Sequence, residues 1–290
     1  MKITRFNDGQ IGVVVDDRIH DITALVGEQA GEWPPMGIVR LIRDFAAQRE
    51  RIASFVAGDA GIPLSNVRLL TPVPWPNKLI AYPVNYVDHA TEMNSVGFAN
   101  VQGFFLKANS SLVGPHDAIE LPALPDRAVH HECELAIIVG KGGREIAEAD
   151  AWQHIFGYAC LLDITVRGKE ERVMRKSYDT FTVVGPWIVT ADEVADPANT
   201  EMRLWVNDEL RQHANTRDLI VNIPKMISLA SSAATLHPGD IIATGTPAGV
   251  GPIVAGDTVR IDIDKVGSMR VPVVQGTRGR NFVFDRSLVG

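Results

Sequence analysis

The sequence is poor in cysteine, and this scarcity excludes one class of fold. Cys133 and Cys160 are the only cysteines among 290 residues, and both fall in apolar runs that predict strands. A fold stabilised by a framework of disulfides is therefore excluded. We interpret both thiols as small, buried, apolar side chains.

Long hydrophobic runs and basic clusters are also missing. No apolar run approaches the roughly 20 residues that span a bilayer, and residues 1–9 lack the apolar core of a signal peptide. The net charge is −7, and Lys and Arg are nowhere concentrated as a nucleic-acid surface requires. We therefore expect a cytoplasmic protein with neither a membrane nor a nucleic acid as partner.

The apolar residues that are present support one large or two modest domains, since they make up 46% of the chain. Residues 1–70 predict a small α+β N-terminal domain, with three short strands followed by an amphipathic helix over 36–56 that ends at Gly58. Prolines at 72, 74 and 76 then exclude a regular helix or a central strand. We place the junction with a larger domain, 71–290, at these prolines.

In the larger domain, short apolar runs alternate with Gly and Pro, which predicts a mainly β fold of the α+β class. Helices are expected at 147–154 and 223–235. The regular βα alternation of a Rossmann sheet or a TIM barrel is absent from the pattern. The expected strands are 79–81, 103–106, 135–139, 158–164, 186–189, 202–206, 241–244, 258–263 and 270–274.

Three acidic residues in apolar runs predict a metal site. Glu132 and Glu134 are two residues apart on an expected strand and would therefore share one face, and Asp163 ends the next apolar run. Three converging carboxylates repel one another unless a cation joins them, and oxygen ligands suit Mg²⁺, Mn²⁺ or Ca²⁺ better than Zn²⁺. The alternative is a half-exposed strand with solvated carboxylates.

A histidine and a glutamate three residues apart, His89 and Glu92, would share one face of a short helix. An imidazole oriented by a carboxylate is a general base near neutral pH. A surface ion pair on the helix is the alternative. The small residues that follow, in 93–98, could form a mobile lid over a pocket.

Positive charge for an anionic substrate follows Asp163 in the sequence. Arg167 could hold a carboxylate in a bidentate pair, and Lys176 could stabilise an enolate, although a basic surface loop is the alternative. In segment 244–251, Thr246 and backbone N–H groups could bind a carboxylate oxygen, or the segment could be a structural turn. It lacks the lysine of a phosphate-binding loop and the glycine spacing of a dinucleotide site.

Two further patterns are interpreted as structural. Asp262 and Asp264 alternate along an expected strand that also carries basic residues, which is typical of a solvated strand face. His130 and His131 precede the first glutamate, but oxygen-rich metal sites seldom include imidazole. We therefore expect neither pair to bind a metal.

From about Leu70 onward, the chain resembles the fumarylacetoacetate hydrolase family, in the branch of 2-hydroxyhepta-2,4-diene-1,7-dioate isomerases and acylpyruvases. The resemblance implies a mixed β-roll or β-barrel core, a Glu, Glu, Asp set that binds Mg²⁺ or a similar cation, and a homodimer. The matching motifs are Asn85-Tyr86-x-x-His89-x-x-Glu92, Leu106-Lys107 with Leu112-Val-Gly-Pro115, His131-Glu132-x-Glu134-Leu-Ala, Gly157-Tyr158 through Asp163, Arg167, Lys176-Ser-Tyr-Asp179-Thr-Phe with Gly185-Pro186, and Thr244-Gly-Thr246-Pro-x-Gly-Val-Gly251.

Members of this family act on β-dicarbonyl acids, so the resemblance implies a divalent-metal-dependent hydrolase that cleaves a C–C bond in an acylpyruvate or a similar keto acid. Two alternatives stay open. One is an isomerase or decarboxylase of aromatic catabolism, and the other is a catalytically silent, metal-dependent ligand-binding module. The residues implied are His89, Glu92 and Lys176 for catalysis, and Arg167, Thr246, Tyr86 and Glu170 for substrate binding.

The chain departs from the family pattern just after Arg167. The family commonly has Arg-Asp followed two residues later by Gln, whereas this chain has Arg167-Gly168-Lys169-Glu170. A glutamate at the Gln position would either place negative charge beside a substrate carboxylate or turn away from it. Pro83 also stands where the family often has Gly or Leu.

Overall fold

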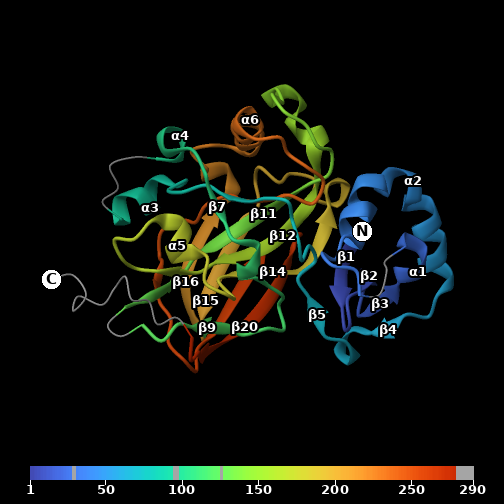
Figure 1. Ribbon diagram of the computed structural model, residues 1–290, viewed down its shortest axis with the longest axis horizontal. Coiled ribbons are helices and arrows are strands. Elements are labelled where there is room, and N and C mark those ends of the chain that lie inside the picture. The colour runs from blue at the N-terminus through green and yellow to red at the C-terminus, as the bar shows by residue number, and fades with distance from the viewer. Residues whose placement is uncertain (28–30, 94–97, 125–126, 279–290) are drawn as a thin grey trace.

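The computed structural model describes residues 1–27, 31–93, 98–124 and 127–278 (Figure 1). Strands predominate, which confirms the predicted mainly β fold. The largest sheet has 12 strands in the order β4-β3-β2-β1-β14-β12-β11-β17-β6-β7, with β5 paired to β1 and β8 to β14. These strands are β1 (Lys2–Phe6), β2 (Gln10–Val15), β3 (Arg18–Asp21), β4 (Ile62–Pro63), β5 (Leu69–Leu70), β6 (Leu79–Ala81), β7 (Phe105–Lys107), β8 (Leu112–Val113), β11 (Cys133–Val139), β12 (Ile155–Asp163), β14 (Thr182–Thr190) and β17 (Ile241–Ala243).

Two smaller sheets complete the β structure of the described chain. One contains β10 (Val129–His131), β13 (Thr165–Val166) and β18 (Gly251–Pro252). The other has the order β16-β15-β19-β20-β9. Its strands are β9 (Ile119–Leu121), β15 (Glu201–Val206), β16 (Glu209–Asn215), β19 (Thr258–Ile263) and β20 (Gly267–Gln275).

Helices are few, and α3, α4 and α5 lie together on the side of the molecule away from α1 and α2 (Figure 1). The helix expected at 36–56 is present as α2, and the one expected at 223–235 is present as α6, which ends two residues earlier. The helices are α1 (Thr23–Val26), α2 (Gly37–Gly58), α3 (Val87–Glu92), α4 (Ala99–Gln102), α5 (Arg172–Lys176) and α6 (Ile223–Ala233), with 3₁₀ helices η1 (Leu64–Asn66), η2 (Asn109–Ser111), η3 (Glu148–His154), η4 (Ala191–Glu193) and η5 (Thr216–Asp218).

Two local expectations need correction. The helix expected at 147–154 is the 3₁₀ helix η3, as is common in short connectors that lead directly into a strand. The strand expected at 103–106 begins at Phe105 instead, because the chain first ends α4 at Gly103, whose φ is +67°. A positive φ of this kind favours glycine and interrupts an extended run.

The N-terminal segment extends the main sheet, because β1 pairs antiparallel with β14 through Lys2↔Val189 and Ile3↔Ile188. Helix α2 packs its apolar face, including Ile38, Leu41 and Ile42, in a buried cluster with β11 and β12 residues. One continuous sheet therefore supports both parts of the chain. The predicted boundary between 1–70 and 71–290 stays a prediction.

Strand β11 has a different apolar cluster on each face. Cys133 and Leu135 pack in one cluster, together with Cys160 of β12, whereas Ala136 and Ile138 pack in the cluster that contains α2. Both cysteines are buried free thiols, as expected. Alternation along β11 thus sends the side chains of even-numbered residues to the α2 side of the sheet, which fixes the direction of Glu132 and Glu134.

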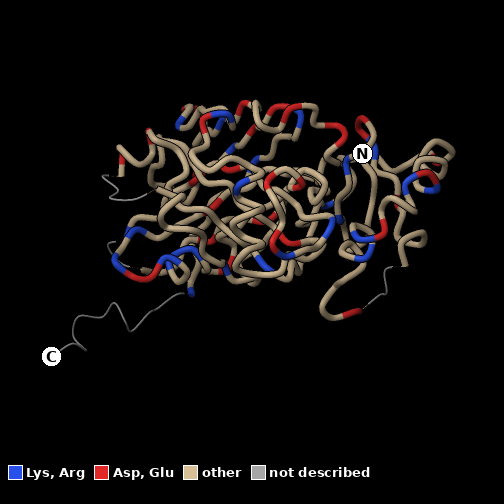
Figure 2. The backbone as a smooth tube through the Cα atoms, turned by 90° about the horizontal axis from the view of Figure 1, so that it is seen from above, with Lys and Arg blue, Asp and Glu red and all other residues tan. Residues whose placement is uncertain are grey.

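Charged residues of both signs are interspersed along the described backbone (Figure 2). Among the residues that the structure describes, no helix is both long enough and apolar enough to cross a membrane.

Candidate active site

The structure brings Glu132, Glu134 and Asp163 together, because β11 and β12 pair in the register Cys133↔Leu162 and Glu134↔Leu161. This register sets Asp163 opposite Glu132, and the Asp163 backbone N–H donates to the Glu132 carbonyl oxygen at 3.0 Å. Opposed residues of an antiparallel pair point to the same face. The three side chains are at most 5% exposed, and one carboxylate oxygen from each lies within 4.8 Å of the others.

This donor set fits a hard divalent cation. Such ions take oxygen ligands at about 2.0–2.6 Å, so ligand oxygens lie no more than about 5 Å apart. The pKa of Glu134 also indicates a cation site. Burial, and then the neighbouring carboxylates Asp163 and Glu132, raise its pKa well above the usual value. A cation among the three carboxylates would remove this penalty on the charged form.

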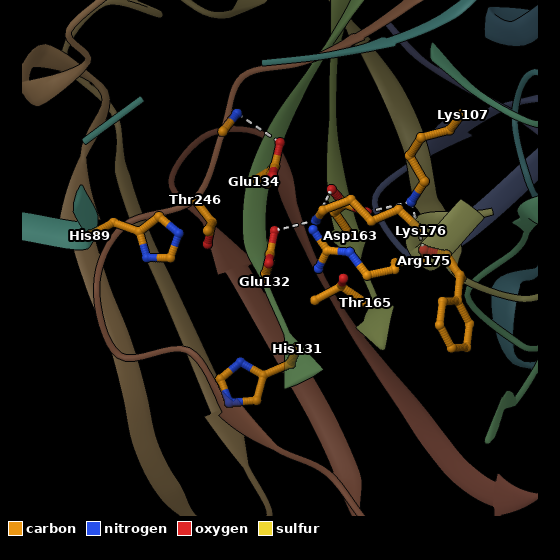
Figure 3. Close-up of polar contacts among 12 residues, drawn as sticks. His89, Lys107, His131, Glu132, Glu134, Asp163, Thr165, Arg175, Lys176 and Thr246 are labelled. Carbon is orange, nitrogen blue, oxygen red and sulfur yellow. Dashed lines mark hydrogen bonds and ion pairs between the residues drawn. The ribbon is translucent and has the colours of Figure 1, made fainter. Parts of the chain in front are cut away.

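Two buried lysines accompany the carboxylates, one predicted and one not. Lys176, from α5, donates from Nζ to Glu132 Oε2 and Asp163 Oδ2, both at 2.6 Å. Lys107, at the end of β7, forms an ion pair with Asp163 and donates to the Phe181 carbonyl oxygen at 2.8 Å. Figure 3 shows both lysines extending toward the carboxylates from one side, with His89 on the opposite side.

The two lysines differ in pKa because their carboxylate partners differ. Burial lowers the pKa of Lys107, and attraction to Asp163 offsets this only in part. Burial also acts against the charge of Lys176, but Asp163 and Glu132 together outweigh it and raise the pKa. For Glu132, burial is the largest single effect and raises the pKa, but Lys176, Arg167 and His89 together outweigh it, so the pKa falls to about 2. Lys107 appeared in the sequence only as part of a motif, without an assigned role.

His89 and Glu92 form the expected pair on α3. His89 Nδ1 lies 3.1 Å from Glu92 Oε2, and the Gly249 backbone N–H donates to Glu92 Oε1 at 3.0 Å. The buried Asn85 fixes the start of α3, because its Nδ2 donates to the carbonyl oxygens of Val221 and Thr244. The imidazole is thus 5% exposed and lines the same cavity as the carboxylates.

A glycine-rich turn after β17 supplies two further groups. The Gly245 backbone N–H donates to Glu134 Oε2 at 2.7 Å. Gly245 has a φ of +93°, and a Cβ there would lie 2.7 Å from the Asn85 Cβ, so only glycine fits. The next residue, Thr246, is 3% exposed and lines the cavity.

The Thr246 hydroxyl has a defined direction because of Gln212, a residue that no sequence pattern singles out. Gln212 Nε2 donates to Thr246 Oγ1 at 2.7 Å and to the Pro247 carbonyl oxygen at 2.8 Å, and the Cys133 backbone N–H also donates to Oγ1, at 3.0 Å. The carbonyl oxygen can only accept, so the amide orientation is unambiguous. With both lone pairs of Oγ1 in use, the hydroxyl hydrogen is free to be donated to a ligand.

His131 supports this network rather than the metal site, as predicted. Its Nδ1 lies 3.1 Å from Gln212 Oε1, which also accepts from the Cys133 backbone N–H at 3.0 Å. Because Oε1 can only accept, the hydrogen of the imidazole is on Nδ1. Burial lowers the pKa of His131 to about 4, so the ring is neutral.

Of the four predicted substrate-binding residues, Arg167 and Thr246 line the cavity, whereas Glu170 and Tyr86 do not. Arg167 Nη2 lies 3.6 Å from Glu132 Oε1, and its Nε and Nη2 have no hydrogen-bond partner among the described residues. Glu170 turns away from the cavity and accepts two hydrogen bonds from Arg127, at 3.0 and 2.6 Å. Tyr86 is 1% exposed and lies at the N-terminus of α3, beside a separate hollow.

The cavity that joins these groups has a volume of about 270 Å³. Met93, at the start of the expected lid, lines it, and residues 94–97 of that lid lie outside the described residues. Pro83, noted above as a departure from the family, also lines it. Besides the predicted residues, the cavity wall includes Phe105, Arg172 and Arg175.

Residues 78–274 match the family described as the C-terminal domain of fumarylacetoacetate (FAA) hydrolase. The chain belongs to the fumarylacetoacetate hydrolase family. A curated relative, maleylpyruvate hydrolase of Aquipseudomonas alcaligenes, is 42% identical over 285 residues, which cover 94% of this chain and 99% of the relative.

Solved structures give the same family. Maleylpyruvate hydrolase from Sphingobium sp. SYK-6, in complex with manganese(II) ion and pyruvate, is 58% identical with a TM-score of 0.89, and the match covers 96% of this chain and 100% of that one. The 2-hydroxyhepta-2,4-diene-1,7-dioate isomerase from Mycobacterium marinum is 32% identical with a TM-score of 0.72, covering 95% of this chain and 98% of that one. Both branches expected from the sequence are therefore represented.

Proposed function

We propose that this protein is a divalent-metal-dependent hydrolase that cleaves the C–C bond of an acylpyruvate, with maleylpyruvate as the first candidate substrate. The observation that carries the proposal is the His89–Glu92 pair in the same cavity as the Glu132, Glu134 and Asp163 carboxylates. A base and a cation site together are what hydrolysis of a β-diketo acid requires. Similarity to two maleylpyruvate hydrolases supports the substrate class.

Each group would have a distinct role. A divalent cation, Mn²⁺ or Mg²⁺, held by the three carboxylates would polarise the oxygens of the 2-oxo acid. His89, oriented by Glu92, takes a proton from water as the water oxygen adds to the acyl carbonyl carbon. The C–C bond then breaks, its electron pair stays with the pyruvate half, and the proton is delivered to that carbon. The products are a carboxylic acid and pyruvate.

The remaining side chains bind and orient the acid. Lys176 stabilises the negative charge that develops on the departing pyruvate half. Arg167 and the Thr246 hydroxyl hold its carboxylate, since both present free donors to the cavity. We propose that Tyr86 supports α3 and Glu170 supports the Arg167 loop, because neither lines the cavity.

The test is a steady-state assay with Mn²⁺ or Mg²⁺ on a panel of acylpyruvates, with chelated enzyme as the control. We expect metal-dependent formation of pyruvate from maleylpyruvate. Binding of oxalate and metal without turnover of any keto acid would instead indicate the silent ligand-binding module. Turnover that persists undiminished after complete chelation would contradict the metal site.

An isomerase or decarboxylase is the second candidate, because the chain is also similar in structure to a 2-hydroxyhepta-2,4-diene-1,7-dioate isomerase. The two reactions differ in whether water is consumed. Hydrolysis in ¹⁸O-labelled water places one labelled oxygen in the new carboxylate, whereas isomerisation incorporates none by addition. Mass spectrometry of the products therefore separates the candidates.

We further propose a cytoplasmic homodimer with domains 1–70 and 71–290. Membership of the family supports the dimer, and the proline-rich segment after Leu70 supports the boundary. Light scattering on the purified chain should give twice the monomer mass of 31.6 kDa. Cell fractionation should place the chain in the cytoplasmic fraction.

A further inference from the structure

Two arginines in the cavity wall have no role in the proposed reaction. Arg172 and Arg175 are three residues apart on α5, immediately before Lys176, and both line the cavity. Residues at this spacing lie on the same side of a helical turn. Neither has a carboxylate within 4.0 Å among the residues that the structure describes, although both are partly buried.

Neutral groups hold both side chains in place. Arg172 Nη2 donates to Gln102 Oε1 at 2.8 Å, and its guanidinium carbon lies 5.4 Å from the centre of the Phe105 ring. Arg175 Nε donates to the Glu170 carbonyl oxygen at 2.9 Å, and Nη1 to the Val166 carbonyl oxygen at 3.4 Å. These contacts orient the guanidinium groups without neutralising their charge.

Burying the two charges without a directly paired carboxylate is costly, which leaves room for an anionic ligand. Burial is the largest effect that lowers the pKa of Arg175, the charges of Arg172 and Arg167 add to it, and the more weakly acting carboxylates of Glu132 and Glu170 offset it only in part. Like charges gathered in a partly buried cavity are unfavourable unless an opposite charge joins them. A ligand carboxylate would supply that charge and accept several guanidinium hydrogen bonds at once.

Glu170, in the loop before α5, pairs with Arg127 and with neither of these arginines. Glu170 accepts both of its hydrogen bonds from Arg127, and Arg127 Nε also donates to the Arg167 carbonyl oxygen at 2.8 Å. A Cβ at Gly168 would lie 1.6 Å from Arg127 Nη2, so the glycine makes room for this pair. The departure from the family pattern at Gly168 and Glu170 therefore leaves Arg175 without a directly paired carboxylate among the described residues.

A charge inventory of the cavity points to an acid with two carboxylates. Three acidic side chains (Glu132, Glu134, Asp163) lie among three basic ones (Lys107, Lys176, Arg167), so the two kinds are equal in number in this group. A divalent cation and two further arginines add positive charge. An acid with two carboxylates offsets more of this positive charge than a 2-oxo acid with a single carboxylate does.

We propose that Arg172 and Arg175 form a subsite for the second carboxylate of the substrate, so that the enzyme selects 2-oxo acids whose far end is a carboxylate. This inference rests on the proposed function and specifies its substrate class. Maleylpyruvate belongs to this class, whereas acylpyruvates with an alkyl end do not.

The test uses binding, so that it does not depend on turnover. Calorimetric titration of the Mn²⁺-loaded full chain compares 2-oxoadipate with 2-oxohexanoate, which have the same length and differ only in a terminal carboxylate or methyl group. We expect 2-oxoadipate to bind about 10- to 100-fold more tightly, the usual range for hydrogen bonds to a charged group. Arg172→Gln with Arg175→Gln should abolish the preference by weakening 2-oxoadipate alone.

Control variants separate this role from a structural one. Arg203→Gln, which changes an arginine on β15 that pairs with Asp264 at 3.2 Å, should keep the wild-type preference. Arg175→Lys keeps the positive charge and should therefore retain part of the preference for 2-oxoadipate. Equal weakening of both ligands in the double variant, or no preference in the wild type, overturns the subsite. The proposed hydrolase activity would survive either result, because the acylpyruvate assay tests it separately.

Discussion

The chain contains two acidic pairs at alternate positions, and they have opposite surroundings. Glu132 and Glu134, at the start of β11, are 5% and 2% exposed and meet Asp163 in the cavity. Asp262 lies near the end of β19 and is only partly buried, and Asp264, just beyond it, is exposed and pairs with Arg203 at 3.2 Å. The same alternation thus produces a candidate metal site in one place and a solvated strand face in the other.

Both strands pair with a neighbour on each edge, so the residues that those neighbours supply explain the difference. Strand β11 is covered on both edges, by β12 and β17, and these neighbours bring Asp163 and the Gly245 N–H to the glutamates. Strand β19 pairs with β15 and β20, and the opposing residues of Asp262 are Arg203 and Ser268. Converging carboxylates need a cation, whereas solvated carboxylates facing an arginine do not.

The sharpest test of this contrast is to remove one carboxylate from each pair. Glu134→Gln should lower kcat/KM by about 10³- to 10⁴-fold, because the several kcal/mol that a bound metal supplies would be lost. Asp262→Asn is the matched control and should change it by less than about twofold, as surface substitutions do. Acylpyruvate hydrolysis under saturating Mn²⁺ measures both.

A thermal unfolding experiment shows whether the loss is one of metal binding. Mn²⁺ at about 100 times its dissociation constant should stabilise the wild type and Asp262→Asn by about 2.7 kcal/mol, which raises Tm by several degrees. Glu134→Gln should show little or no shift. An equal shift in all three proteins would remove Glu134 from the ligand set.

Two histidine–glutamate pairs, one in the site and one on the surface, allow the same kind of comparison for the proposed general base. His89 pairs with Glu92 in the cavity, and His213 pairs with Glu201 on the surface, with ring-to-carboxylate distances of 3.1 and 2.6 Å. His89→Asn should lower kcat by about 10²- to 10³-fold without changing metal affinity, because it removes only a general base. His213→Asn should have no measurable effect on kcat. Comparable losses in both variants would contradict a catalytic role specific to His89.

A smaller effect is expected from the residue that orients Thr246. In Gln212→Glu the new carboxylate cannot donate to Thr246 Oγ1, so the hydroxyl would turn to donate to it and be lost to the substrate. We expect KM to rise about 10-fold with a smaller change in kcat. The exposed Gln153→Glu carries the same charge change and should leave KM unaltered. An unchanged KM in Gln212→Glu would exclude this orienting role.

The smallest effect is expected at Glu170, although the family pattern first drew attention to it. Glu170→Gln keeps a hydrogen-bond acceptor for Arg127 and lies outside the cavity, so kcat/KM for maleylpyruvate should fall by less than about threefold. Arg127→Gln should behave similarly or slightly worse, because Arg127 also holds the Arg167 carbonyl oxygen. A loss of 100-fold in Glu170→Gln would instead place this carboxylate on the substrate.

Sequence reasoning succeeded where the information is local or where motifs recur in order. The shared face of Glu132 and Glu134 follows from the strand period, and the His89–Glu92 contact follows from three-residue spacing in a helix. Asp163 and Lys176 were likewise expected from the residues, as the acid that ends the next apolar run and as positive charge that follows it, and the family motifs agreed with both. His89, Glu132, Glu134, Asp163 and Lys176 line one cavity, and Glu92 contacts His89.

Sequence reasoning did not find Lys107, Gln212, Arg172 and Arg175 as parts of the site. Lys107 is 56 residues from its partner Asp163, and Gln212 is 34 residues from Thr246. A lysine at a strand end or a glutamine in a strand has no distinctive local pattern. The two arginines were part of what could have been a basic surface loop, and only the cavity wall distinguishes them.

By itself, the sequence determined the mainly β class, the even-residue face of β11 and the pairing on α3, because backbone periodicity sets these over a few residues. Only the tertiary structure decided that one acidic pair is buried and the other solvated, that Glu170 faces Arg127, and that Arg172 and Arg175 line the cavity without a directly paired carboxylate among the described residues. These outcomes depend on which distant segments meet and how much water they exclude, and burial sets the free energy of a charge far more than its sequence neighbours do.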